Sequence, residues 1–247
     1  MIEEALKLFD AYSRRARVLP GLWAMAPVFI AGALLVPKQP LTALLPIAVG
    51  CGFTVLLASI VRNLGKNLER QLVGDWDGMP TTHLLRHREA GNPAIFDRRR
   101  KALERLYGQP LPTRRQEAAN PANADEVYVA ATRRLIDQVR ARNDEFPLVQ
   151  HENITYGRAR NMLALRPYAV GVIGLAAVID YYVWTQKGAA AGWAVVVVAH
   201  AVLLGCWLCF VRESWVRQAA DTYAERLFEA LDRMTATDQP TAGTNST

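Results

Sequence analysis

Two ionisable side chains stand inside long apolar stretches of the sequence, and they are the first candidates for chemistry. Asp180 lies in the stretch 167–185 and His200 in the stretch 189–211, and neither stretch holds another charged side chain. Ionisable groups at membrane depth are costly and commonly mark proton or ion pathways. We expect Asp180, about two helical turns from the end of its stretch, to reach water. We expect His200, nearer the middle, to be either a functional group or a neutral imidazole bonded to a neighbouring helix.

A metal site is the second chemistry that the residue types suggest. His83 and His87 stand four residues apart, which would place both on one face of a helix, and His151 could supply a third ligand. However, no acidic motif accompanies them, and Arg86 and Arg88 flank the pair. We therefore expect no metal here and keep the three histidines only as weak candidates.

Other catalytic motifs are missing or unconvincing. Cys206 and Cys209 have the spacing of a redox or zinc motif, but they lie inside an apolar stretch without partner ligands, so we interpret them as structural thiols. The sequence has no Walker motif, no glycine-rich dinucleotide loop, no serine elbow and no paired carboxylates. Nothing in the sequence demands an enzyme, and we expect no cofactor.

Four apolar segments must position these residues. They cover residues 18–36, 41–61, 167–185 and 189–211, each about as long as the roughly 20 residues that cross a bilayer core. Because only short turns join the first to the second and the third to the fourth, the sequence predicts an all-α membrane protein. Two transmembrane hairpins, residues 18–61 and 167–211, would enclose an inserted helical domain, residues 62–166.

Basic residues indicate the orientation of these helices. The predicted turns carry only Lys38 and Lys187, whereas the insert holds 19 of the 29 lysines and arginines. Lysine and arginine accumulate on the cytoplasmic side of a membrane. We therefore expect a multi-pass protein with both termini and the insert in the cytoplasm.

The insert and the flanks are expected to be helical. In the insert, Asn92 and Gly108 should cap one helix, whose expected buried face is Ile95, Phe96, Leu103, Leu106 and Tyr107. The pair Thr113 and Gln116 should form a capping box, and a second long helix should cover 125–142. Outside it we expect an amphipathic helix over 1–17, an amphipathic cytoplasmic helix over 212–234 with heptad spacing, and a disordered tail over 235–247. The heptads, together with small residues four apart in the apolar segments, are typical of a homo-oligomer but also of packing within one chain.

A polar helical face precedes the third apolar segment. Its residues recur every three or four positions and comprise Glu152, Asn153, Tyr156, Gly157, Arg160 and Asn161. Unpaired polar groups there would cost on the order of 1–3 kcal/mol each, so we expect partners at Asn63, Asn67 or Thr81. The face is either an internal lock or the point where the insert is coupled to the membrane helices, with Arg160 able to pair with a carboxylate or an anionic ligand.

The insert is basic, with clusters at 98–101, 114–115 and 133–134 and with Arg86 as a further candidate. Two ligand classes fit such clusters: anionic lipid headgroups and a nucleotide-like anion. Ordinary positive-inside bias explains them equally well. Nucleic acid is disfavoured because exposed aromatic residues do not interleave the clusters.

Short motifs in the insert resemble those of an uncharacterised family of bacterial four-helix integral membrane proteins. The residues that carry the resemblance are Pro80-Thr81-Thr82, Leu84-Leu85-Arg86, Leu111-Pro112-Thr113 with Glu117, Ala124-Asp125 with Tyr128, Phe146-Pro147-Leu148, and Glu152-Asn153 with Tyr156-Gly157 and Arg160-Asn161. The resemblance implies a bacterial inner membrane and a cytoplasmic helical insert, and no established activity.

Three functions follow as expectations. The first is a non-enzymatic membrane sensor or effector, for example in stress or anti-phage defence, whose basic cytoplasmic domain binds an anionic signal, a lipid or a partner. The second is a small transporter or channel that uses His200 and Asp180. The third is a metal-dependent membrane enzyme that uses the histidine pair.

Overall fold

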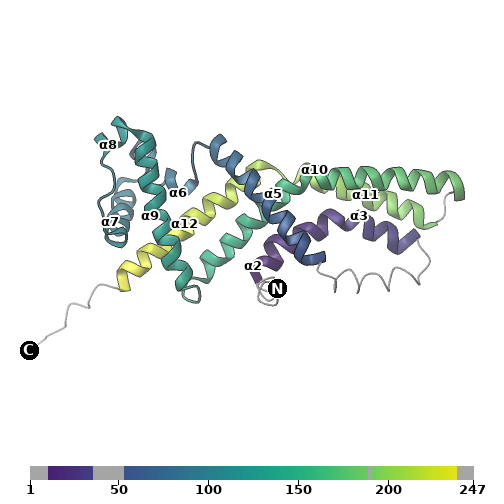
Figure 1. The fold of residues 1–247 in the computed structure, drawn as a ribbon, viewed down its shortest axis with the longest axis horizontal. Helices are drawn as coiled ribbons and strands as arrows, with labels where there is room; N and C mark the ends of the chain where they lie inside the picture. Colours follow the sequence, from purple (N-terminus) through teal and green to yellow (C-terminus); the bar gives the residue numbers. More distant parts are fainter. Residues whose placement is uncertain (1–10, 36–52, 189–190, 238–247) are drawn as a thin grey trace, which may run out of the picture. The chain divides into compact units, whose positions relative to one another are not determined.

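The computed structural model describes residues 11–35, 53–188 and 191–237, and no strand occurs in these ranges. Two compact units make up the chain (Figure 1). The first, which we call the apolar unit, comprises Met1–Gln71 and Ile154–Arg217, and the second, the polar unit, comprises Leu72–Asn153 and Gln218–Thr247. The chain is therefore all-helical wherever it is described, as the sequence predicts.

The apolar unit contains the long hydrophobic helices. Its elements are α2 (Ala11–Ser13), the π-helical turn η1 (Arg14–Val18), α3 (Leu19–Leu35), most of α5 (Phe53–Asp75), most of α10 (Pro147–Lys187), α11 (Ala191–Cys209) and the start of α12 (Glu213–Thr237). Helix α3 packs against α11. A core cluster unites α3, α5, α10 and α11 through Ala24, Val61, Leu165, Ala169, Ile173, Trp207 and Val211. The sequence places apolar residues all round these helices, so only part of that surface is buried.

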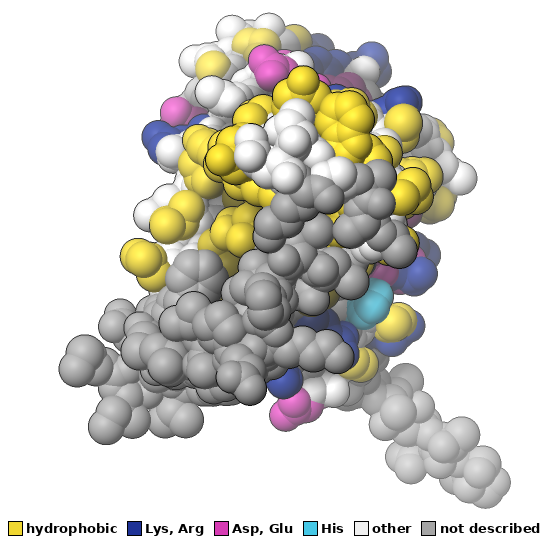
Figure 2. Space-filling model, turned by 90° about the vertical axis from the view of Figure 1, so that its right-hand side faces the viewer, with side chains coloured by type: hydrophobic (Ala, Val, Ile, Leu, Met, Phe, Trp, Pro, Cys, Tyr) yellow, Lys and Arg dark blue, Asp and Glu magenta, His cyan; other side chains and the backbone are white. Residues whose placement is uncertain are grey.

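Two helices, α10 and α11, are long and apolar enough to cross a membrane. Large apolar side chains on both helices are exposed to solvent, with Leu175 63% and Val202 60% exposed. Figure 2 shows hydrophobic side chains gathered over this part of the chain. A core helix of a soluble protein would bury most of these side chains. The expected number of four membrane spans stays a prediction. Much of the segment 41–61 and the turn at 37–40 lie outside the described residues.

The polar unit is built from shorter helices. These are α6 (Pro80–His83), the 3₁₀ turn η2 (His87–Glu89), α7 (Pro93–Tyr107), α8 (Arg114–Ala119) and α9 (Pro121–Ala141), with the first turns of α10 and most of α12. Helices α6, α7 and α8 each contact α9. Helix α9 is therefore the element around which this unit is assembled.

The local capping signals are confirmed. Asn92 accepts hydrogen bonds from the backbone of α7, Gly108 ends that helix in the left-handed conformation, and Thr113 forms a capping box with Gln116. Helix α9 begins at Pro121, four residues before the predicted start. The reason is that Asn120 caps it by accepting from the backbone N–H of Asn123 at 3.1 Å.

Two expectations for the polar unit are corrected, one on the buried face of α7 and one on the end of α12. Ile95, predicted to be buried on α7, is exposed, and the buried face instead includes Arg100. On α12 the heptad residues of the polar unit are buried: Ala220, Tyr223, Leu227, Ala230 and Met234. Val216, the heptad residue that belongs to the apolar unit, is buried as well. The guanidinium of Arg99 lies 4.7 Å from the ring centroid of Phe228, so α12 packs within the unit. The helix ends at Thr237, three residues beyond the predicted 234, and the rest of the tail lies outside the described residues.

The segment that carries the histidine pair does not form the predicted single helix. Helix α6 ends at His83, Arg86 is extended, and His87 opens the separate turn η2. The prediction that His83 and His87 lie on one helix face, where both could bind a metal, is therefore wrong.

Candidate functional site

Asp180 and His200 form a buried pair in the apolar unit. Nδ1 of His200, on α11, lies 2.7 Å from Oδ2 of Asp180, on α10, and Nε2 of His200 lies 3.2 Å from the backbone oxygen of Pro27, on α3. Both side chains are almost completely buried, at 4% and 3% exposed. Three helices therefore meet at one imidazole ring.

The neighbours of His200 determine where its protons are. The carbonyl oxygen of Pro27 can only accept a hydrogen bond, so Nε2 carries a hydrogen. Nδ1 then either donates to the Asp180 carboxylate or accepts from the protonated acid. In both arrangements the pair is neutral overall and holds one proton between Nδ1 and Oδ2.

The environment of Asp180 differs from the expectation that it reaches water. Its side chain is buried, and its Oδ1 atom has no hydrogen-bond partner among the described residues. Its backbone oxygen accepts from the indole N–H of Trp193 at 3.0 Å. The reason for the difference is helix packing: α11 covers the side chain that the sequence position alone would leave near the surface.

A second polar group of the apolar unit joins α5 to α10, and we call it the junction cluster: Glu69, Tyr156, Arg160 and Asn161. Arg160 Nη1 lies 2.8 Å from Glu69 Oε2, and the Tyr156 hydroxyl donates to Glu69 Oε1, also at 2.8 Å. Arg160 is 8% exposed. One carboxylate therefore satisfies both the guanidinium and the phenol.

Asn161 extends the junction cluster to the N-terminal segment. Its amide nitrogen donates to the backbone oxygen of Ala16, and its Oδ1 accepts from Nε and Nη2 of Arg160 at 3.4 Å. Two glycines leave space for neighbouring side chains, Gly65 for Asn161 and Gly157 for Tyr12. A Cβ atom on Gly65 would lie 1.9 Å from Asn161 Oδ1, and one on Gly157 would lie 2.8 Å from the Tyr12 hydroxyl.

The predicted partners of this face were wrong. Asn67 accepts from Arg70, and Thr81 belongs to the polar unit, whereas the carboxylate that holds Arg160 is Glu69. The sequence contained a usable signal, because Glu69 is the single acidic residue between Phe53 and Leu72. Glu152 and Asn153, the first residues of the predicted face, are half-buried and fall in the polar unit.

Arg86 is the centre of an ion-pair group in the polar unit. Its Nε donates to Asp125, its Nη1 to Asp77 and Glu89, and its Nη2 to Asp125 and to the backbone oxygen of Asp77. Burial alone would lower its pKa, but the hydrogen bonds that Arg86 donates to Asp125 and Glu89 raise the pKa above its ordinary value. Because all five donors are used and the side chain is 1% exposed, Arg86 does not present its charge to a soluble anion.

Glu117 anchors the neighbouring part of the polar unit. It accepts from the backbone N–H groups of His87 and Arg88 and from the hydroxyl of Tyr128 at 2.8 Å. Burial alone would raise the pKa of Glu117, but these hydrogen bonds hold it below its usual value. Burial and the bond to Glu117 raise the pKa of Tyr128 to about 12. Arg100 completes the group by donating to the backbone oxygens of Leu85 and Pro112.

The three histidines proposed as metal ligands have other surroundings. His83 pairs with Glu89, His87 lies 3.3 Å from the backbone oxygen of Pro112, and His151 is exposed. Burial, together with the charge of Arg100, lowers the pKa of His87. In the part of the chain that the structure describes, no three His, Cys, Asp or Glu side chains lie close enough to share a metal.

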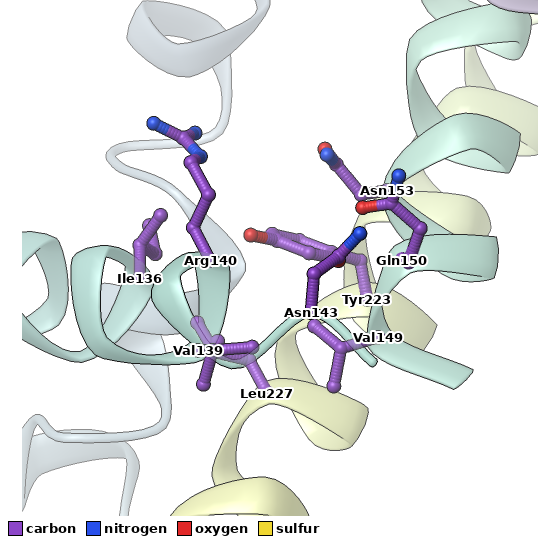
Figure 3. A pocket seen from close by; sticks show the side chains of 9 residues that line it. All are labelled: Ile136, Val139, Arg140, Asn143, Val149, Gln150, Asn153, Tyr223 and Leu227. Carbon is purple, nitrogen blue, oxygen red and sulfur yellow. The ribbon is translucent and has the colours of Figure 1, made fainter. Parts of the chain in front are cut away.

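A small cavity lies in the polar unit where α9, the start of α10 and α12 meet. Figure 3 shows the amide side chains of Asn143, Gln150 and Asn153 on one side of it and Arg140 on the other, with Tyr223 between. Its volume of about 30 Å³ has room for a single water molecule. A second hollow of about 170 Å³ lies beside Phe146 and Arg226. Ligand pockets usually measure about 300–1,000 Å³, so neither has the size of a nucleotide site.

Comparisons with known proteins identify no relative: no family model, no curated protein and no solved structure matches the chain. The resemblance of the insert motifs to a bacterial membrane family therefore stays a prediction. Function is inferred below from the geometry of the chain alone.

Proposed function

We propose that the chain is a non-enzymatic, multi-pass membrane sensor or effector, in which the polar unit controls the packing of the membrane helices through the junction cluster. The observation that carries this proposal is the ion pair of Glu69 and Arg160. Glu69 lies on α5 and Arg160 on α10, and both helices continue from the apolar unit into the polar unit. A change in the path of either helix would have to break or move this pair.

The energy of the pair suits such a role. Removing one partner of a fully buried ion pair costs roughly 3–5 kcal/mol. Here Glu69 is 29% exposed, so solvent screening reduces the cost to about 2 kcal/mol. That is large enough to hold one packing arrangement and small enough for a ligand or partner to overcome.

A cytoplasmic polar unit and a bacterial inner membrane remain part of the proposal. The exposed apolar surfaces of α10 and α11 support the membrane location, and the distribution of basic residues supports the cytoplasmic side. The bacterial inner membrane is proposed from the resemblance of the insert motifs alone. Because Arg86 is used internally and the cavities are small, a macromolecular partner or a lipid headgroup fits the polar unit better than a nucleotide.

The proposal is tested by changing the apolar unit and measuring the polar unit, since coupling between two sites is reciprocal. Arg160→Ala should accelerate amide exchange in α7 while the protein still inserts into membranes. Arg160→Lys should not restore protection, because lysine cannot reach Glu69 and Asn161 together with the fork geometry of arginine. Arg62→Ala, which removes an exposed charge from α5, is the control. Unchanged exchange in α7 for Arg160→Ala would refute the coupling.

A transporter or channel is the second candidate, and the observation in its favour is the buried pair of Asp180 and His200. Ionisable pairs at such positions often serve proton or ion movement.

A further inference from the structure

We propose that Asp180, His200 and the backbone oxygen of Pro27 form a proton-binding site, occupied by one shared proton whenever α3, α10 and α11 are packed together. The inference rests on the proposed membrane location of the apolar unit but not on the coupling role of the junction cluster. The ligand is a proton, because the geometry offers two basic atoms, Nδ1 and Oδ2, only 2.7 Å apart.

The proton count follows from the hydrogen-bond partners. With Nε2–H donating to Pro27, removal of the shared proton leaves a carboxylate beside a neutral imidazole, with net charge −1. Addition of a further proton gives a neutral acid beside an imidazolium, with net charge +1. Either state buries an isolated charge, whereas the state with one shared proton is neutral.

No other charge compensates the pair within the helices that surround it. The described parts of α3 and α11 carry no Lys, Arg, Asp or Glu, and from Pro167 to Gln186 α10 carries only Asp180. Apart from the pair itself, the other titratable side chains of α3, of α11 and of α10 from Pro167 to Gln186 are phenols and thiols: Tyr168, Tyr181, Tyr182, Cys206 and Cys209. The pair must therefore balance its own charge.

Release of the proton is consequently linked to helix packing. Separating α11 from α10, or admitting water to Oδ1 of Asp180, would solvate the charge that release creates. An entering water molecule would bind Oδ1, because this atom is buried and has no hydrogen-bond partner among the described residues. The site would thus exchange its proton in a loosened arrangement and keep it in the packed one.

Solid-state NMR of the full chain in anionic lipid bilayers tests the site directly. With labelled histidine and aspartate, we expect Nε2 of His200 to stay protonated, and the Asp180 carboxyl and Nδ1 signals to change together in one step as the pH is varied. Asp180→Asn should abolish that step. The double variant Asp180→Asn with His200→Gln keeps polar groups of similar shape, and the membrane-bound protein should release one proton fewer per chain on alkaline titration than the unmodified protein.

Three results would overturn the proposal: an unprotonated Nε2, separate titration of the two side chains, or equal proton release by the unmodified protein and the double variant. The variant Glu69→Gln separates this test from the proposed function. It should leave the joint step in place, so a failure of the coupling role would not remove the proton site. If Glu69→Gln abolished the step, the site would not be independent and the inference as stated would be wrong.

Discussion

Glu69 and Arg160 form an ion pair at 2.8 Å although 91 positions separate them along the chain. The same carboxylate accepts a hydrogen bond from Tyr156, so α5 and α10 are joined by two polar contacts at one acidic residue. Replacement of Glu69 would therefore remove, in one step, the carboxylate that accepts from both Arg160 and Tyr156.

The close approach of α5 and α10 depends on Gly65. We expect Gly65→Ala to lower the free energy of unfolding by about 1–3 kcal/mol, because the added methyl would overlap the side chain of Asn161. Thermal unfolding in detergent measures the effect. Gly171→Ala is the matched control on α10, since a Cβ there meets nothing within 4 Å. Equal stability of the two variants would contradict the described packing.

The substitution Arg86→Lys should lower the free energy of unfolding of the polar unit. A lysine keeps the charge but cannot donate to Asp77, Glu89 and Asp125 at once, so we expect a loss of about 2–4 kcal/mol. Chemical denaturation followed by circular dichroism gives the value. The control is Arg105→Lys, an exposed position on α7, for which the expected change is below about 0.5 kcal/mol.

The stability of the polar unit should fall at acidic pH partly because of Glu117. Its folded pKa lies below the ordinary value of about 4.3, so its contribution is fully present above pH 4.3 and disappears as the pH falls through the folded pKa. Glu117→Gln should therefore flatten the acid side of the stability profile while lowering stability at neutral pH. A profile parallel to that of the unmodified protein would show that Glu117 contributes nothing through protonation.

The orientation in the membrane can be checked with labels. A cysteine at Gln186, exposed in the last turn of α10, should react with an impermeant reagent from outside the cell, and a reporter placed at Gln109, exposed after α7, should behave as cytoplasmic. The two native cysteines of α11 and Cys51 are first replaced by serine. Reaction of the Gln109 site from outside would overturn the topology.

Sequence reasoning succeeded where neighbouring residues decide the structure. The caps at Asn92, Gly108 and Thr113 are examples, since each depends on hydrogen bonds within four residues. It failed where distant segments decide. Arg100 replaces Ile95 in the buried face of α7 because two backbone oxygens, those of Leu85 and Pro112, happen to face it.

The candidate sites show the same division. Asp180 and His200 could each be recognised as unusual, but their pairing depends on the register of α10 against α11 and on the Pro27 carbonyl of α3. The partner of Arg160 was missed although Glu69 is the single acidic residue between Phe53 and Leu72 of α5.

The central claim is that the polar unit controls the membrane helices through Glu69 and Arg160, and a distance measurement tests it most directly. Spin labels at Leu56 and Leu175, both exposed in the apolar unit, report the arrangement of α5 and α10 in lipid nanodiscs. Arg86 lies in the polar unit. We predict that Arg86→Met shifts this distance distribution, and that the shift disappears when Arg160→Met is also present. A distribution that ignores Arg86→Met, or that shifts equally with and without Arg160, would contradict the account.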